Sequence, residues 1–303
     1  MTAITARPLP ALSHALTGAP APAPTLGAGA ASVGQEFSFS PADHEQVCEL
    51  IYRRAGISLN SGKQAMVYSR LSRRLRETSH SSFAGYLQWL HQADGASAEA
   101  EWQEFVNCLT TNLTAFFREE HHFSALADDL RARPGRPVRI WCSAASTGEE
   151  PYSIAMVVAE TLGPQAAVQI LASDIDTKVL ATARRGVYEA GARGLSAERL
   201  KRHFLRGTGA NTGQVRIRPE LARWIEFRSF NLMSTAWALG EAFDIIFCRN
   251  VMIYFDAATQ RRVLTHMRGV LRPDGLLYVG HSENFNDARE LFHLRGKTIY
   301  QRT

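Results

Sequence analysis

The feature that most constrains the fold of this chain is a regular alternation of apolar and amphipathic segments from residue 138 onward. Four short runs are nearly continuous in apolar residues, and they cover 138–142, 168–172, 243–248 and 276–280. Segments with helical periodicity lie between them, at 151–162, 178–185 and 257–271. Apolar strands that alternate with helices are typical of a parallel sheet covered on both faces. The sequence therefore predicts an α/β domain in the C-terminal part of the chain.

One segment, 201–230, does not follow this alternation. It contains Gly207 and Gly209, and polar and apolar residues then alternate with a period of two over 215–218. Such a period is typical of an antiparallel strand with one exposed face. We expect a small β-subdomain here, inserted into the α/β domain.

The residues before the α/β domain have helical patterns with short connections. Ser40 followed by Pro41 is typical of a helix start, and Gly56 ends the first apolar helical face. Further helices are expected near 63–77, 82–91 and 98–109. A chain of 303 residues is long enough for two domains. We therefore predict a small all-α domain and linker over 36–118 and the α/β domain over 119–303.

Residues 1–35 are dominated by Ala, Pro, Gly, Ser and Thr, with prolines at positions 8, 10, 20, 22 and 24. This composition predicts a disordered lead-in, because proline interrupts helices and strands alike. A signal peptide is the alternative, but no uninterrupted apolar segment follows a basic start. No run of about 18 apolar residues occurs, so no transmembrane helix is expected either. We expect a cytoplasmic protein without direct membrane insertion.

The cysteines Cys48, Cys108, Cys142 and Cys248 are far apart and show no CxxC or Cys/His spacing. Metal sites built on cysteine have short, regular ligand spacings. Isolated cysteines in a chain of this length favour reduced thiols and a cytosolic location. We therefore predict no metal site.

Small residues fill the loop after the first predicted strand, 143–148, and Glu149 and Glu150 begin the helix that follows. Small side chains let a ligand approach the backbone at the carboxyl edge of such a sheet. Two carboxylates would repel a pyrophosphate, whereas they suit a cationic, hydroxyl-rich ligand such as S-adenosylmethionine. The alternative is that both glutamates only stabilise the positive end of the helix dipole.

Asp174 and Asp176 follow the second predicted strand. An acidic residue at this strand end typically accepts hydrogen bonds from ribose hydroxyls. Either aspartate could instead cap the next helix. We assign Asp174 to the ribose and Asp176 to the helix cap.

Two further segments carry polar groups that could belong to an active site. Asn250 and Tyr254 follow the strand at 243–248. The segment 110–118 is dense in hydroxyl and amide groups and ends in two phenylalanines and Arg118, so as an active-site wall it would supply donors, two aromatic faces and a fixed cation. Both have simpler interpretations, since Tyr254 could be a hydrogen-bonded core tyrosine and 110–118 an ordinary linker. The Asn/Asp-Pro-Pro-aromatic motif of nucleic-acid base methyltransferases is absent after this strand.

The net charge of +5 is weak support for a nucleic-acid partner, and its distribution is more informative. The stretch 53–76 holds seven Lys and Arg residues and no Asp or Glu. Arg70, Arg73 and Arg74 have the spacing of one helix face. A solvated face is the usual explanation, but uncompensated charge favours docking of an acidic protein partner. We predict that the partner-binding residues include Arg53, Arg70, Arg73 and Arg74.

Several long motifs together resemble the CheR-type chemotaxis receptor methyltransferases, over roughly residues 40–303. The stretches that carry the resemblance are TNLTAFFR at 111–118, ASTGEEPYS at 145–153, SDID at 173–176, FCRNVMIYF at 247–255 and GHSEN at 280–284. Long motifs in the right order are far more specific than a single glycine pattern.

The resemblance implies a class I S-adenosylmethionine-dependent methyltransferase, which has a Rossmann-like doubly wound sheet with an inserted antiparallel β-subdomain after an all-α domain. It implies methyl transfer to glutamate side chains on the cytoplasmic helices of chemoreceptors, with S-adenosylhomocysteine as the other product. Matching positions imply cofactor contacts from Asn112, Thr114, Arg118, Glu149, Asp174, Asn231, Leu232 and Asn250. Arg118 and Tyr254 are expected nearest the transferred methyl group.

The resemblance also suggests a second contact with the receptor. The β-subdomain is similar to that of family members that bind the receptor's C-terminal peptide, which adds a strand to the sheet edge. Gly207, Gly209 and Arg216 are the residues of this chain expected in that contact.

The chemistry of the residues is compatible with this activity. A glutamate carboxylate, with a pKa of about 4.3, is ionised at pH 7 and can attack a sulfonium methyl group without a general base. Because an anion and a cation give two neutral products, positioning and exclusion of water should supply most of the rate. Two alternatives remain, a nucleic-acid methyltransferase and a non-catalytic cofactor-binding module. The first lacks its motif, and the presence of Arg118 and Tyr254 argues against the second.

Overall fold

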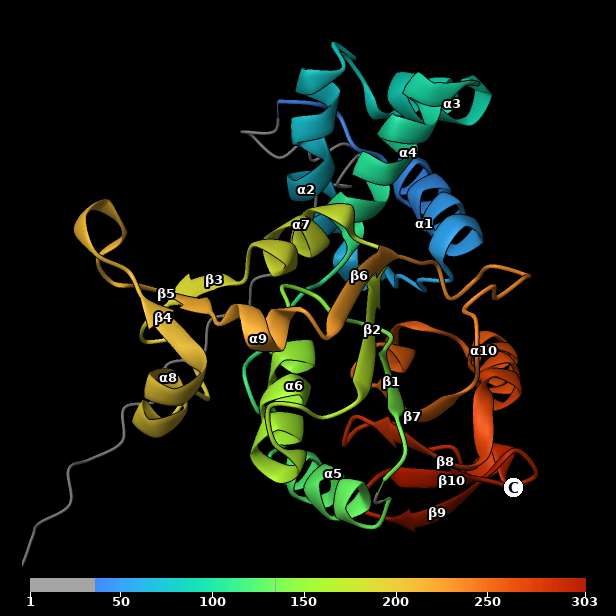
Figure 1. The fold of residues 1–303 in the computed structure, drawn as a ribbon. Coiled ribbons are helices and arrows are strands. Elements are labelled where there is room, and N and C mark those ends of the chain that lie inside the picture. The colour runs from blue at the N-terminus through green and yellow to red at the C-terminus, as the bar shows by residue number, and fades with distance from the viewer. Residues whose placement is uncertain (1–35, 134) are drawn as a thin grey trace, which may run out of the picture. The chain divides into compact units, whose positions relative to one another are not determined.

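A computed structural model of the chain describes residues 36–133 and 135–303. The predicted disorder of residues 1–35 lies outside the described residues. Residues 37–303 form one unit by their internal contacts, and Figure 1 shows how its helices and strands are arranged.

The N-terminal part of this unit is the predicted helical bundle. Its helices are α1 (Pro41–Ala55), α2 (Gln64–Glu77), α3 (Phe83–Gln92) and α4 (Ala96–Leu109), with a short 3₁₀ turn η1 (Ser61–Lys63) before α2. Ser40 caps α1 by accepting a hydrogen bond from the Asp43 amide, and Gly56 ends it in the left-handed conformation. The apolar faces of the helices share one core cluster, so their sequence periodicity was interpreted correctly.

Among the described residues, the larger sheet has the strand order β6-β2-β1-β7-β8-β10-β9. The strands are β1 (Val138–Cys142), β2 (Val168–Asp174), β6 (Ile225–Ser229), β7 (Phe243–Cys248), β8 (Leu271–Val279), β9 (Phe292–Gly296) and β10 (Ile299–Arg302). From β6 to β8 all neighbours are parallel, and the apolar segments predicted this for β1, β2, β7 and β8 but not for β6. The β10 and β9 edge is antiparallel, and the sequence analysis did not predict these two strands.

Helices cover both faces of the larger sheet, as predicted. Figure 1 shows α5 (His121–Arg131) and α6 (Glu149–Leu162) on one face and α10 (Ala257–Val270) on the other. Each face has its own apolar cluster. Helix α7 (Thr177–Arg185) follows β2 at the carboxyl edge of the sheet. Helix α5 was not predicted, and β8 begins at Leu271, earlier than the predicted strand at 276–280.

The β-subdomain is present, but its predicted bounds of 201–230 are wrong at both ends. Its sheet has the order β3-β5-β4 and is antiparallel, with β3 (Val187–Glu189), β4 (Phe204–Arg206) and β5 (Gln214–Ile217). Helix α8 (Ala197–His203) and the turn η2 (Gly209–Asn211) connect these strands, and the short helix α9 (Pro219–Ala222) follows. β6 belongs to the larger sheet, where it pairs with β2. It is an edge strand with a mixed pattern of exposure, so its sequence resembled the subdomain.

Within the described residues, no helix has both the length and the apolar composition that a membrane span requires.

Candidate active site

A cavity of about 410 Å³ lies where the carboxyl ends of β1, β2 and β7 meet the helical bundle. Ligand pockets typically have volumes of roughly 300–1,000 Å³. The predicted catalytic and cofactor-binding residues that line it are Asn112, Thr114, Arg118, Asp174, Asn231, Leu232, Asn250 and Tyr254. Residues far apart in sequence meet here because the carboxyl ends of parallel strands share one edge of the sheet.

Of the two acidic residues at the end of β2, Asp176 caps the next helix as predicted, and Asp174, which we expect to bind the ribose, lines the cavity. Asp176 caps α7 by accepting hydrogen bonds from the amides of Lys178 and Val179. Asp174 lines the cavity, is almost fully buried and accepts the Ser146 amide at 2.8 Å. Burial raises the pKa of Asp174 to about 6, although amide donors oppose that rise. A ribose that donates its hydroxyls would stabilise the ionised form.

Glu149 is the predicted cofactor residue that does not line the cavity. Its carboxylate accepts a hydrogen bond from Thr147 Oγ1 at 2.6 Å, and burial raises its pKa. The next residue, Glu150, lines the cavity instead. Successive residues of a helix point about 100° apart, because a turn has 3.6 residues. The structure therefore places Glu150, and not Glu149, at the wall.

The linker 110–118 is a wall of the cavity, as one of our two interpretations proposed. Asn112 Nδ2 donates to Asp176 at 2.8 Å, and Arg118 Nη1 donates to the Leu113 carbonyl at 2.8 Å. These bonds fold the linker across the end of β2.

The aromatic pair of the linker, however, does not face the cavity. Phe116 and Phe117 are buried, and Phe116 packs edge-on against Tyr188 of the β-subdomain, with ring centroids 4.9 Å apart. The Arg199 guanidinium lies over the Phe117 ring at 3.7 Å from its centroid. Our expectation of two aromatic faces in the active-site wall was therefore wrong, and these rings anchor the linker to the subdomain.

Asn250 and Tyr254 lie on the segment that follows β7. Asn250 has a left-handed backbone, with φ 58°, and its side-chain amide donates to Glu119 at 3.3 Å. The Tyr254 carbonyl accepts the Ser58 amide at 2.8 Å, which ties this segment to the helical bundle. Among the described residues, no hydrogen bond engages the Tyr254 hydroxyl. The alternative of a hydrogen-bonded core tyrosine therefore does not apply.

Asn231 and Leu232 line the cavity from the segment after β6. Leu232 is buried, and Asn231 Nδ2 donates to the Arg54 carbonyl at the end of α1, at 2.7 Å. Gln103 of α4 donates to the Ile175 carbonyl at 2.8 Å. The helical bundle is thus bonded to the sheet on several sides of the cavity and closes it.

Arg249 is a site residue that the sequence analysis missed. It lines the cavity, its side chain is fully buried, and it pairs with Glu150 at 2.5 Å and Glu119 at 3.2 Å. Its second nitrogen donates to the Arg118 carbonyl at 2.5 Å. An arginine directly after a buried apolar strand needs buried acidic partners. That signal was present in the sequence, but the identity of the partners was not.

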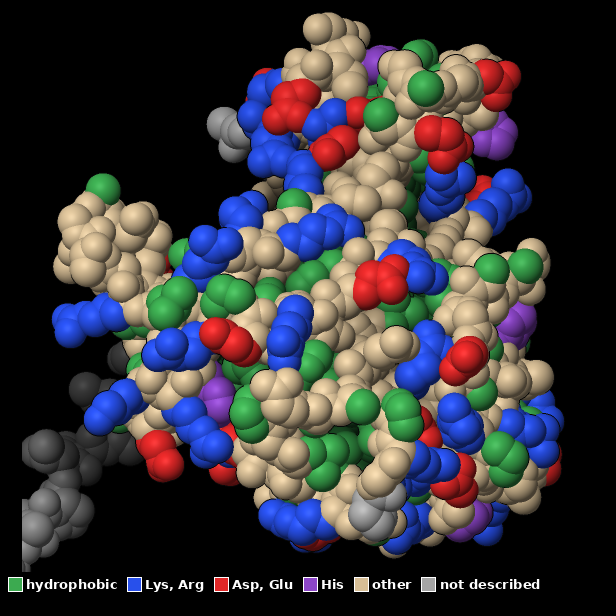
Figure 2. Space-filling model, viewed as in Figure 1, with side chains coloured by type: hydrophobic (Ala, Val, Ile, Leu, Met, Phe, Trp, Pro, Cys, Tyr) green, Lys and Arg blue, Asp and Glu red, His purple; other side chains and the backbone are tan. Residues whose placement is uncertain are grey.

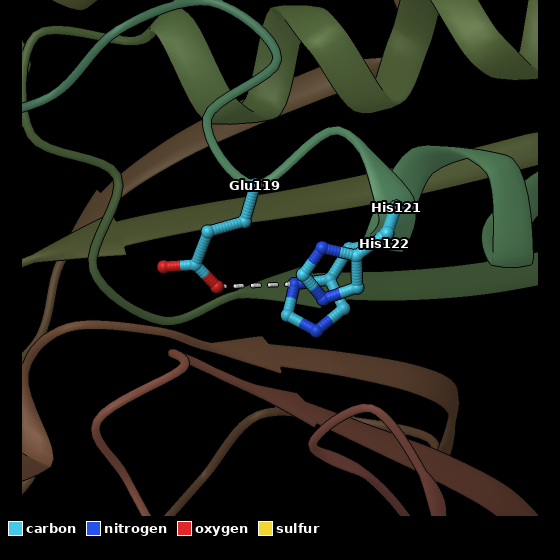
Figure 3. A group of neighbouring side chains, drawn as sticks. All are labelled: Glu119, His121 and His122. Carbon is cyan, nitrogen blue, oxygen red and sulfur yellow. Dashed lines mark ion pairs between the residues drawn. The ribbon is translucent and has the colours of Figure 1, made fainter.

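Glu119, His121 and His122 form a titratable group beside this network, and Figure 3 shows the three side chains converging. Their ligand atoms lie within 4.8 Å of one another. His122 Nε2 lies 3.0 Å from both the Lys297 carbonyl and Thr298 Oγ1, and His122 Nδ1 lies 3.5 Å from the Glu119 carboxylate. Burial and the charge of Arg249 lower the pKa of His122 to about 4. Its ring is therefore neutral at pH 7.

This group has the residue types of a metal centre, for which we had predicted no site. Glu119, however, is already bonded to Arg249, Asn250 and His281. Burial raises its pKa, but the His281 bond and the charge of Arg249 outweigh burial and lower the pKa to about 2. A divalent cation at Glu119 would lie beside the Arg249 guanidinium. We therefore assign Glu119 to the Arg249 network.

The predicted basic docking face of α1 and α2 is largely neutralised. Arg53 pairs with Glu49 at 2.5 Å and Arg73 with Glu77 at 3.3 Å. Arg74 is buried and paired with Glu101 and Glu77, so its assignment to a docking face was wrong. Arg70 lines the cavity and donates to the Thr110 carbonyl at 2.7 Å. The partners lie outside 53–76, and for this reason the stretch looked uncompensated.

Gly207, Gly209 and Arg216 lie together in the β4–β5 hairpin. A Cβ on Gly207 would collide with the Asn211 carbonyl, and Gly209 has φ +57°. Both glycines therefore have a conformational role in the turn. Arg216 is exposed on β5, the middle strand of the small sheet.

Comparisons with known proteins match both parts of the chain. Residues 42–110 match the family model of the CheR methyltransferase all-alpha domain, and residues 112–301 match the CheR methyltransferase SAM binding domain. The models divide the chain where α4 ends, before the predicted boundary at 118.

Relatives cover nearly the whole chain. It is 51% identical over 283 residues to chemotaxis protein methyltransferase 2 of Pseudomonas aeruginosa, which covers 92% of this chain and 97% of that protein. It is 50% identical over 276 residues to the chemotaxis protein methyltransferase of Klebsiella aerogenes, covering 90% and 94%. The Salmonella typhimurium protein of that name is 50% identical over 268 residues, covering 88% and 92%.

The parallel sheet, the buried acid at the end of β2 and the small-residue loop beside the cavity fit S-adenosylmethionine, and together they define an S-adenosylmethionine-dependent methyltransferase. With these relatives and both family models, the chain belongs to the CheR methyltransferase family. It is a methyltransferase of chemotaxis.

Proposed function

We propose that this enzyme transfers methyl groups to glutamate side chains on the cytoplasmic helices of chemoreceptors, forming γ-methyl esters. The observation that carries the proposal is that Arg118 and Tyr254 line the same cavity as Asp174. A cation and a free phenol next to a cofactor site suit an acceptor that is a carboxylate.

S-adenosylmethionine supplies an electrophilic methyl group on a sulfonium when it is bound. In the proposal Arg118 orients the acceptor carboxylate and Tyr254 holds it by donating a hydrogen bond. No general base is required, because a glutamate is ionised at pH 7. The described residues of the cavity wall include no histidine, which is compatible with such a reaction. Closure by the helical bundle would exclude water from the reacting atoms.

Further cations lie around the cavity and favour an acidic acceptor segment. Lys63 and Arg70 line it from η1 and α2. Lys63 has no ion pair with any residue in the described part of the chain. We propose that these residues face the acidic receptor helix, whereas Arg74 does not.

We also propose that the β-subdomain binds the receptor's C-terminal peptide as an added strand. The charge of residues 178–223 supports this, with eleven Lys and Arg against three Asp and Glu, a net charge of +8. Figure 2 shows basic side chains gathered over α7, the small sheet and α8. The exposed basic residues there include Arg193, Lys201, Arg202, Arg206 and Arg216. A carboxylate-bearing peptide would meet a complementary surface.

The central experiment incubates the chain with methyl-labelled S-adenosylmethionine and receptor-rich membranes. We expect label in the receptor that is released by mild base, as a methyl ester is. Base-stable label in the receptor, or label in RNA or DNA, would contradict the proposal.

Substitution of Tyr254 tests the proposed hydrogen bond. Tyr254→Phe should lower turnover by roughly 10- to 100-fold, while the dissociation constant for S-adenosylhomocysteine changes by less than about threefold. Arg118→Ala should also lower turnover, with a larger loss of cofactor affinity. Tyr68→Phe is the matched control, because Tyr68 lies in the helical bundle outside the cavity wall. Full methyl transfer by both Tyr254→Phe and Arg118→Ala would contradict the proposed roles of these two residues.

Reversal of one charge tests the proposed binding of the receptor's C-terminal peptide to the β-subdomain. Arg216→Glu should raise the KM for intact receptor about tenfold and leave cofactor affinity unchanged. Arg289→Glu, an exposed arginine outside the subdomain, is the control and should have no effect. An equal effect of both variants would show that only overall charge matters.

A further inference from the structure

The chain leaves the sheet after β7 through a turn whose backbone amides converge on one side chain. Asn250 is left-handed, and the turn η3 (Met252–Tyr254) follows directly. Within the described residues, the amides of Asn250, Val251 and Met252 donate to no carbonyl. A buried amide without a partner costs roughly 1–3 kcal/mol. Met252 is buried and Asn250 and Val251 are partly buried, so these three consecutive amides require an acceptor.

Glu283, in the loop after β8, is that acceptor. Its Oε2 accepts the amides of Asn250 at 2.9 Å and Gly280 at 2.6 Å. Its Oε1 accepts the amides of Val251 at 3.0 Å and Met252 at 2.7 Å. Its side chain is buried, and these donors occupy both oxygens as an ionised carboxylate requires.

The same segment is also fixed through the side chain of Asn250. That amide donates to Glu119, and it packs so closely on Gly280 that a Cβ there would collide with it. A left-handed non-glycine residue costs of order 1–3 kcal/mol and persists only when its surroundings hold it. Glu283, Glu119 and Gly280 provide these surroundings. Asn250 and Tyr254, near the two ends of the segment, both line the cavity.

We propose that Glu283 is a positioning residue for methyl transfer. It holds the segment 250–254 so that Asn250 faces the cofactor and Tyr254 faces the acceptor. Glu283 does not line the cavity, so it acts through these two residues. The inference rests on the proposed function, because Tyr254 acts there on the acceptor carboxylate.

The first variant is Glu283→Gln, which keeps the size of the side chain but turns an NH₂ group toward amide donors. We expect kcat to fall at least about tenfold, while the dissociation constant for S-adenosylhomocysteine rises less than about threefold. The smaller effect on affinity follows because Asp174 and the linker hold the cofactor from other walls.

The matched control is Glu101→Gln. Glu101 is also a buried glutamate, but it pairs with Arg74 in the helical bundle outside the cavity wall. It should lower the melting temperature and leave kcat within about twofold. Both variants are assayed at a temperature at which circular dichroism shows them folded. A kcat of Glu283→Gln within twofold of the wild type would overturn the proposal.

A double-mutant cycle with Tyr254→Phe separates positioning from general stability. If Glu283 acts through Tyr254, the double variant should lose little more kcat than the worse single variant. Losses that multiply fully would overturn the proposal. If Glu283→Gln does not fold, Gly280→Ala takes its place, because its methyl group would displace the Asn250 amide from the other side. Normal kcat in Gly280→Ala would then overturn the proposal.

Ester formation by the wild-type chain is measured first and tests the proposed function alone. The variants are then compared in that active system. A failure of the positioning role is therefore recognised by unchanged kcat in an enzyme that still makes the ester.

Discussion

Two buried arginines in this protein have the same chemistry and different consequences. Arg74, between α2 and α4, is paired with Glu101 and Glu77. Arg249, after β7, is paired with Glu150 and Glu119. Only Arg249 and Glu150 line the cavity. The role of a buried ion pair therefore depends on its surroundings. The Arg74 pairs stabilise the packing of α2 on α4, whereas the Arg249 pairs stabilise the wall of the active site.

The largest effect is expected from Arg249→Met. It leaves Glu150 buried and Glu119 partly buried without their cation, and breaking such a network costs about 3–5 kcal/mol of unfolding free energy. It also releases the Arg118 carbonyl. Because a shift of about 1 Å can cost a hundredfold in rate, single-turnover methyl transfer should fall at least about a hundredfold. Near-normal turnover in folded Arg249→Met would show that Arg249, like Arg74, contributes only to stability, and it would contradict the proposed difference between them.

Arg74→Met should lower stability without lowering turnover. It leaves Glu101 buried and unpaired, so urea unfolding should again report a loss of about 3–5 kcal/mol. Turnover of the folded fraction should stay within about twofold, because Arg74, Glu77 and Glu101 do not line the cavity. A loss of turnover comparable to that of Arg249→Met would mean that the helical bundle transmits its packing to the site.

The sequence predicted the parts of the site that depend on strand ends. Apolar runs located β1, β2 and β7, so Asp174 at the end of β2 and Asn250 two residues after β7 were correctly expected to meet at one edge of the sheet. Helix-capping rules also separated Asp176 from Asp174. These predictions succeeded because strand ends and helix caps are determined by residues that are close together in the sequence.

Long-range partners could not be predicted in the same way. Arg74 looked like part of an uncompensated face, because Glu101 lies outside the stretch that was counted. Phe116 and Phe117 looked like part of an active-site wall until the fold placed Tyr188 and Arg199 against them. The net positive charge of 178–223 could be counted in the sequence. Only the fold shows that α7, α8 and the small sheet bring these basic residues onto one surface.

A smaller effect is expected in the pH dependence of cofactor binding and of stability, where the carboxylates of Asp174 and Glu119 differ. Asp174 has a pKa of about 6 because it is buried without a cation. If only its ionised form accepts the ribose, the dissociation constant for S-adenosylhomocysteine should rise about tenfold from pH 7 to pH 5. Calorimetry at several pH values measures this, and Asp174→Asn should remove the dependence.

The sign of the stability effect differs between the same two groups. The pKa of Asp174 lies above its unfolded value of 3.8, so the chain without cofactor gains stability from it as pH falls from 6 toward 4. The pKa of Glu119 is lowered from 4.5 to about 2, so its contribution is lost as pH falls through that window. Asp174→Asn and Glu119→Gln should therefore change the acid limb of a stability profile in opposite directions.

The smallest effect is expected from Arg73→Glu, on the exposed side of the helix that carries Arg74. Arg73 is half exposed, and within the described part of the chain it pairs only with Glu77, at 3.3 Å. Such surface pairs contribute about 0–1 kcal/mol. The reversal also places a like charge beside Glu77, so a loss of less than about 1 kcal/mol is expected in urea unfolding. Receptor methylation should change by less than about threefold, well below the effect of Arg216→Glu. A tenfold loss of methylation at unchanged stability would return Arg73 to the receptor-binding surface proposed for Lys63 and Arg70, still without Arg74.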